Sequence, residues 1–200
     1  MEYYDELCAN PDVTVTEASG AQIYYAEMNM TDPILSDINV RKAIIKGMSR
    51  DNLSAYMDET LTPAYSLILS KCLNYSDDAV NYYKENYDYD PDEANRLLDE
   101  AGWKDSDGDG IREKDGTKLS FTFDDRDTES AKAIGQSLQI DMKAIGIDMQ
   151  ITTQDWSYVN QDVNDGNFQM AYLGLGWSEP FLLLDMFCQR NAEATNPDPD

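Results

Sequence analysis

The chain has 200 residues, 42% of them hydrophobic, which is enough to bury a core as one domain or two small ones. Its 39 acidic and 15 basic residues give a formal net charge of −24, spread along the sequence, which argues against nucleic acid and anionic membranes as partners. Histidine is absent, which removes the commonest general base and the commonest zinc ligand, so hydrolase triads and zinc sites are poor hypotheses.

The cysteines and the apolar segments add two expectations. Cys8, Cys72 and Cys188 lie far apart in the sequence, so we expect three buried free thiols, with one disulfide and a leftover thiol as the alternative. No stretch reaches the roughly 20 apolar residues of a membrane helix, and the first 30 residues lack the pattern of a signal peptide.

The first helical pattern covers residues 38–50, where Val40, Ala43 and Ile44 lie at helical spacing. Ser36 or Asp37 is placed to cap its start. A second short helix is expected after Ser49, carrying Leu53, Tyr56 and Met57. Both helices have one apolar face to bury.

The clearest helix begins after Asp90, with Pro91 at its first position and Glu93 placed to complete a capping-box-like pair. Gly102 is predicted to end it. The tyrosine-rich run at 82–90 that precedes this helix is interpreted as amphipathic packing, with a ligand platform as the alternative.

From residue 119 onward strands and helices alternate. We expect strands at 119–123, 147–151 and 168–176, a helix at 128–145, and another helix around Trp156 that ends near Gly166. This alternation predicts parallel pairing through right-handed crossovers, with helices covering the sheet.

The loop at 103–116 carries Asp105, Asp107 and Asp109 at the spacing that opens an EF-hand calcium loop. Ile111 would supply the backbone carbonyl at position 7, but position 12 is Gly116 in place of the required glutamate. A strand, not a helix, is expected to follow. Two interpretations stay open. The loop is either a turn whose carboxylates accept hydrogen bonds from backbone amides or a partial calcium site.

Three blocks in this order resemble the extracytoplasmic solute-binding proteins of peptide-type and nickel-type ABC transporters. Residues 24–53 resemble the family's strand and the helix that follows it, and residues 89–123 resemble its "YDP..A..LL.EAGW.D.DGDGI" run. Residues from 134 to 177 resemble its third block, which ends in a Gly-Trp pair. The resemblance covers about residues 24–187.

The resemblance implies an α/β fold, one lobe of a clamshell of the type II periplasmic-binding-protein kind, with a mixed sheet and flanking helices. Residues 1–200 would form the single carboxy-terminal lobe, and the other lobe, which in the family carries the signal sequence and the lipid-attachment cysteine, is not in this sequence. Members close two lobes on a solute and present it to a membrane permease without chemistry. We therefore expect a monomeric, membrane-tethered extracytoplasmic protein that is not an enzyme and needs no cofactor, with a peptide or other small solute and ABC permease subunits as partners.

The resemblance also places the candidate ligand-binding residues. The family's "GW..DY.DP" aspartate, which pairs with a peptide amino terminus, would fall where Ser178 and Glu179 stand in a segment two residues shorter. Either Glu179 replaces that aspartate or the amino-terminal contact is lost. Trp156 and Trp177 would line the cavity, with core packing as the alternative for Trp156 and a hydrophobic contact of the shortened loop as the alternative for Trp177.

One further position and one rival function complete the predictions. Asn29 is a candidate for the cleft, whereas Tyr25 is expected to pack in the core. The rival function is an acidic calcium-binding surface module that uses the Asp105 to Asp115 loop. It explains one loop, while the family resemblance explains three ordered blocks.

Overall fold

The computed structural model describes residues 4–16, 20, 22–56, 61–70, 72–73 and 75–176. Its centre is a four-stranded sheet, and the strands are β1 (Gln22–Met28), β4 (Ser120–Arg126), β5 (Asp148–Gln154) and β6 (Met170–Gly176). Their order is β1-β6-β4-β5. β4 is parallel to both β5 and β6, whereas β1 is antiparallel to β6.

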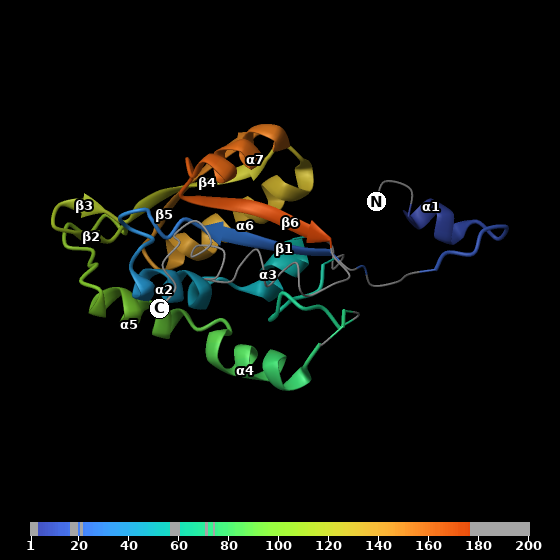
Figure 1. Ribbon diagram of the computed structural model, residues 1–200, viewed down its shortest axis with the longest axis horizontal. Coiled ribbons are helices and arrows are strands. Elements are labelled where there is room, and N and C mark those ends of the chain that lie inside the picture. The colour runs from blue at the N-terminus through green and yellow to red at the C-terminus, as the bar shows by residue number, and fades with distance from the viewer. Residues whose placement is uncertain are drawn as a thin grey trace, which may run out of the picture.

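Helices cover both faces of this sheet (Figure 1). α6 (Glu129–Ala144) and α2 (Ile38–Gly47) share the main core with the sheet, and α7 (Trp156–Asp165) lies on the opposite face. α5 (Pro91–Glu100) packs on the outside of α2. The largest fully buried side chains of the main core include Phe121, Phe123, Ile44, Leu98, Leu138 and Met142.

Side-chain caps fix where several of these helices begin. Asp37 accepts a hydrogen bond from Asn39 N, Asp90 from Glu93 N and Thr128 from Ala131 N. At the other end of α7, Gly166 has a φ of 74°, in the left-handed region that glycine adopts without strain. The predicted caps Asp37 and Asp90 and the predicted stops Gly102 and Gly166 are confirmed, whereas the helix predicted at 38–50 ends at Gly47 because the Met48 backbone is extended.

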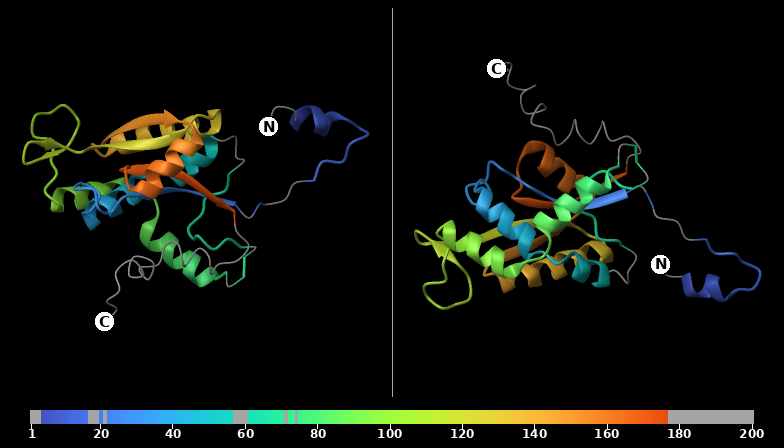
Figure 2. Two further views of the ribbon diagram at one scale, coloured as in Figure 1. Left: turned by 45° about the horizontal axis from the view of Figure 1, so that its top comes forward. Right: turned by 90° about the horizontal axis from the view of Figure 1, so that it is seen from below.

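The remaining described elements lie around this body. α3 (Arg50–Tyr56) follows α2, and Ser49 caps it by accepting from Asn52 N. α4 (Asp77–Tyr87) lies below the sheet in Figure 1, and α1 (Tyr4–Ala9) stands apart from the body in each view of Figures 1 and 2. β2 (Glu113–Lys114) and β3 (Thr117–Lys118) form a small hairpin at the edge where β4 begins.

The predicted parallel β-α-β-α-β order is confirmed, but two strands extend beyond their expected ends. β4 continues through Asp124, Asp125 and Arg126, and β5 continues to Gln154, because both are held by paired backbone on a neighbouring strand. The register pairs Asp125 with Thr153 and Arg126 with Gln154. Backbone pairing thus extends the sheet through charged residues, whereas the side-chain pattern predicted strands only to residues 123 and 151.

Three local expectations are wrong or only partly right. Glu93 makes no reciprocal capping bond, since the Asp90 amide donates to Lys46 O and the Glu93 carboxylate binds Arg96. The tyrosine-rich run is not core packing, because α4 has no buried residue and Tyr82 and Tyr83 are exposed. Cys8 is exposed, whereas Cys72 is buried as expected. Met57 and Cys188 lie outside the described residues.

Candidate functional site

The carboxyl ends of the three parallel strands lie at one edge of the sheet. β4 ends at Arg126, β5 at Gln154 and β6 at Gly176, and the antiparallel β1 begins there with Gln22 paired to Gly176. From this edge β4 leads to α6 on one face, and its neighbour β5 leads to α7 on the other. In open α/β sheets, ligands bind at the carboxyl ends of neighbouring strands whose following helices lie on opposite faces of the sheet.

An arginine surrounded by aromatic rings occupies this edge. The Arg126 guanidinium carbon lies 4.9 Å from the ring centroids of both Trp156 and Tyr172, and 5.8 Å from that of Tyr24. Tyr24 and Tyr172 stack with their centroids 5.7 Å apart. These distances are within the range of cation–π attraction. We call Tyr24, Arg126, Trp156 and Tyr172 the arginine cluster.

The local backbone makes room for this cluster. An added Cβ at Gly174 would lie 2.9 Å from the Tyr24 ring and 3.4 Å from an Arg126 terminal nitrogen. Any larger residue at this position in β6 would therefore push the Tyr24 ring off its place beside the guanidinium. The glycine at position 174 therefore lets the Tyr24 ring and the Arg126 side chain lie close to the β6 backbone.

The polar groups of the cluster are only partly satisfied. The Arg126 Nε is buried and has no hydrogen-bond partner, and no carboxylate of the described residues forms an ion pair with the guanidinium. Burial raises the pKa of the Tyr172 hydroxyl, and the nearby Arg126 charge opposes that rise. Trp156 and Tyr24 remain 41% and 38% exposed, so the cluster is open to solvent.

Two buried aspartates lie directly before the arginine on β4. Asp124 is 7% exposed, and burial together with the neighbouring Asp162 charge raises the pKa of its carboxyl to about 6. Asp125 is fully buried, with one carboxylate oxygen accepting from the Arg126 amide and the other without a partner. Burial also raises the pKa of Asp125.

The structure places only one of the five predicted ligand-binding residues in the cluster. Trp156 belongs to it, and its exposure rules out the core alternative. Trp177, Ser178 and Glu179 come immediately after the end of β6 at Gly176, and they lie outside the described residues. Asn29 is at the opposite edge of the sheet.

Asn29 has a structural role at that opposite edge. Its side-chain amide donates to Gly166 O and Phe168 O at 3.1 and 2.8 Å, and its carbonyl accepts from Thr31. These bonds tie the end of β1 to the turn between α7 and β6. Tyr25 packs beside Val159 and Leu173, as expected for a core residue.

The loop at 103–116 also lies at the amino edge, where it precedes β4 (Figure 1). Carboxylate oxygen atoms of Asp105, Asp107 and Asp109 come within 4.8 Å of one another. However, each of these side chains accepts a hydrogen bond from a backbone amide of the loop. Lys118 forms ion pairs with Asp109 and Asp107. The Ile111 amide donates to Asp109. These contacts support the turn interpretation of the loop.

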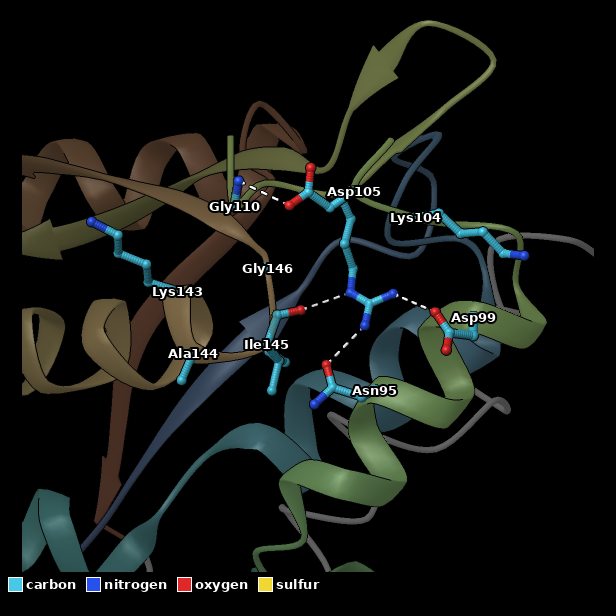
Figure 3. Close-up of a pocket in the computed structure, with 10 residues that line it drawn as sticks. Asn95, Asp99, Lys104, Asp105, Gly110, Lys143, Ala144, Ile145 and Gly146 are labelled. Carbon is cyan, nitrogen blue, oxygen red and sulfur yellow. Dashed lines mark hydrogen bonds and ion pairs between the residues drawn. The ribbon is translucent and has the colours of Figure 1, made fainter. Parts of the chain in front are cut away.

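A second arginine, Arg112, joins this loop to the rest of the protein beside the pocket drawn in Figure 3. Arg112 donates to Ile145 O, Trp103 O, Asp99 and Asn95 at 2.6 to 3.0 Å. The pocket of about 490 Å³ beside it is bordered by Lys104, Lys143 and Asp105. Every Arg112 nitrogen is used to hold α5, the loop and the end of α6 together, so this arginine is structural.

None of the described helices is long and apolar enough to cross a membrane. The family model for bacterial extracellular solute-binding proteins, family 5 Middle, matches residues 2–193. The chain belongs to this family. Its α/β architecture, with a mixed sheet between helices, is that of the type II periplasmic binding proteins, as predicted.

The relatives are proteins of transport systems. The chain is 30% identical to the oligopeptide-binding protein AppA of Bacillus subtilis over 166 residues, which is 82% of this chain and 30% of AppA. The structure of that AppA with a nonapeptide matches 80% of this chain and 32% of its own, with a TM-score of 0.71 and 28% identity. NikA of Brucella suis in complex with Fe(III)-EDTA matches 80% of this chain and 31% of its own, with a TM-score of 0.68 and 28% identity. The chain thus spans about a third of the length of these relatives.

Sequence reasoning missed three of the four cluster residues. Arg126 lies beyond the expected end of its strand at residue 123, although a cation near the carboxyl end of an expected parallel strand is a usable signal. Tyr24 and Tyr172 come together only through the antiparallel pairing of β1 with β6. No local pattern in the sequence indicates that pairing.

Proposed function

We propose that this chain is the carboxy-terminal lobe of the solute-binding protein of an ABC transporter, and that the arginine cluster forms this lobe's side of the solute site. The observation that carries the proposal is the position of Arg126 and Trp156. They lie at the ends of neighbouring parallel strands whose connections leave toward opposite faces of the sheet. Trp177, Ser178 and Glu179 continue from the same edge and belong to the proposed site.

A peptide is the solute class we propose, since the AppA relative is an oligopeptide-binding protein whose structure holds a nonapeptide. Exposed tryptophan and tyrosine rings contact extended chains of varied sequence through apolar area, which suits a peptide carrier. We assign the protein no catalytic step and no required cofactor. The complete protein acts outside the cytoplasmic membrane, tethered to it, as a monomer that delivers solute to permease subunits.

Native mass spectrometry of the complete protein that contains this chain tests the proposal. We expect bound peptides in protein purified without unfolding, and their loss in Trp156→Ala. Tyr158→Ala is the matched control, because Tyr158 is an exposed aromatic residue of the same helix, 62% exposed, that is outside the cluster. Equal peptide loading of all three proteins would remove the arginine cluster from the site, and the absence of any peptide would contradict the peptide assignment.

A further inference from the structure

Three described aspartates are buried, and Asp124 is the one whose side chain makes no hydrogen bond. Asp125 accepts from the Arg126 amide, and Asp141 accepts from the Ser49 amide, both at 2.8 Å. Asp124 is 7% exposed, and its carboxyl has no hydrogen-bond partner among the described residues. A buried carboxylate without a donor is unfavourable, so the charge state of Asp124 depends on its neighbours.

The Asp124 side chain points toward α7. Its neighbour Asp125 lies against Gly135 of α6, and side chains alternate along a strand, so Asp124 is on the opposite face of the sheet. The residues paired with it on the flanking strands are Ala171 and Thr152, and neither of them titrates. Ala171 packs under α7, which places Asp124 at the same interface.

The charged group that α7 brings to this interface is Asp162. Its charge and the burial of Asp124 together raise the pKa of the Asp124 carboxyl to about 6. Gln154, at the end of β5, donates to Asp162 Oδ2 at 3.0 Å and holds that carboxylate at the interface. On β4 the next residue of the same face is Arg126, whose guanidinium lies against the Trp156 ring. A proton on Asp124 therefore changes two like charges into an acid that can donate to a carboxylate.

Few other contacts hold α7 on the sheet. Val159 is the one fully buried residue of this helix, and it packs against Ala171 and Leu173. Trp156 is the first residue of the same helix, six positions before Asp162. Because a helix of this length moves as a unit, a shift at Asp162 also moves Trp156.

We propose that Asp124 is a positioning residue that makes solute binding depend on pH, because the proton it shares with Asp162 holds α7 and Trp156 in the binding position. When Asp124 loses this proton, the two carboxylates repel each other and α7 moves away from the sheet. Asp124 acts through α7 and does not contact the solute. This inference rests on the proposed function, since it adds a regulation to the site that contains Trp156.

Peptide binding at two pH values tests the inference in the complete protein. The probe is a pool of short synthetic peptides of glycine, alanine, serine and leucine, whose termini keep nearly the same charge between about pH 5 and about pH 7. Equilibrium dialysis with mass-spectrometric counting measures the binding, with a chelator present so that no metal ion bridges the two carboxylates. We expect the wild-type dissociation constant to rise about fivefold or more between these pH values.

Three variants identify the group that titrates. Asp124→Asn cannot lose a proton and its amide can still donate to Asp162, so it should bind equally at both pH values. Asp162→Asn removes the opposing charge at a half-buried position, and it should also reduce the pH dependence. Asp141→Asn is the matched control, because Asp141 is a buried aspartate of α6 that accepts from Ser49 and Asn52, and it should keep the wild-type pH dependence.

Thermal unfolding checks that each variant is folded, and Asp162→Asn decides alone if Asp124→Asn does not fold. A wild-type dissociation constant that is the same at both pH values would overturn the inference and leave the peptide carrier in place. A pH dependence of unchanged size in Asp124→Asn and Asp162→Asn would also overturn it, since another group would then be responsible. Failure of the wild-type protein to bind the pool at either pH would contradict the proposed function itself.

Discussion

At the amino edge of the sheet, Arg112 donates to two backbone carbonyls and two side chains, whereas at the carboxyl edge Arg126 lies among three aromatic rings. Both residues are arginines next to strand ends, yet their surroundings differ in kind. An arginine whose N–H groups all donate to protein acceptors stabilises the fold. An arginine with a buried N–H group that has no acceptor among the described residues can donate to a ligand. Hydrogen-bond partners therefore separate the two roles.

The largest expected effect is the difference between the two arginines in how much each contributes to the free energy of unfolding. Arg112→Gln removes several partly buried hydrogen bonds that join α5, the loop and the end of α6, so we expect the free energy of unfolding to fall by about 2 to 4 kcal/mol. Arg126→Gln should change it by less than about 1 kcal/mol, since cation–π contacts at open sites are weak. Urea unfolding followed by circular dichroism measures both, and equal losses would abolish the distinction between the two edges.

A second prediction concerns Asp125, the buried residue that precedes Arg126 on β4. A Cβ at Gly135 would lie 2.5 Å from the buried Asp125 carboxylate, so Gly135→Ala should destabilise the fold by about 1 to 2 kcal/mol. In an Asp125→Ala background the clash is gone, and the same substitution should be neutral or slightly stabilising, because alanine favours the helix. A loss of equal size in both backgrounds would show that Asp125 does not fix this approach of α6 to β4.

The third prediction is a pH dependence. Burial and the Asp162 charge raise the pKa of folded Asp124 to about 6, above the value of about 3.9 for an unfolded aspartate. Between these values the folded state holds more protons than the unfolded state, so the Asp124 contribution to stability is greatest at low pH and falls as pH rises through about 6. We expect about 1 to 2 kcal/mol across this window.

Asp124→Asn provides the control for that dependence. The amide has a similar shape and does not titrate, so the difference between the two unfolding curves isolates the Asp124 contribution. Parallel pH profiles for Asp124→Asn and the wild-type protein would show that another group produces the change.

The smallest effect belongs to the acidic loop. Asp105 accepts from Gly108 N and Gly110 N at 2.7 and 3.0 Å, so Asp105→Ala should lower the unfolding free energy by about 1 kcal/mol. Asp107, which accepts from one amide, should matter less. We expect calcium at about 1 mM to leave the melting temperature unchanged. A calcium-dependent rise that Asp107→Ala removes would restore the calcium interpretation of this edge.

The sequence predicts much of the fold because its helices carry their own start and stop residues. Asp90 and Pro91 mark the start of α5, and Thr128 and Gly146 flank α6. The candidate site is harder to predict, because the cluster joins residues from β1, β4, α7 and β6. Trp156 could be found from the family resemblance, whereas the position of Arg126 is only a weak signal in the sequence, and its aromatic neighbours are known only from the structure.

The most direct test of the account is hydrogen–deuterium exchange on the complete protein with and without a saturating pool of short peptides that have free carboxyl termini. If the arginine cluster forms part of the solute site, we expect slower amide exchange at residues 124–128 and 154–160, which surround the cluster, and no change at residues 104–118. Protection of the acidic loop with none at the carboxyl edge would contradict it, and would place the functional surface at the opposite end of the sheet.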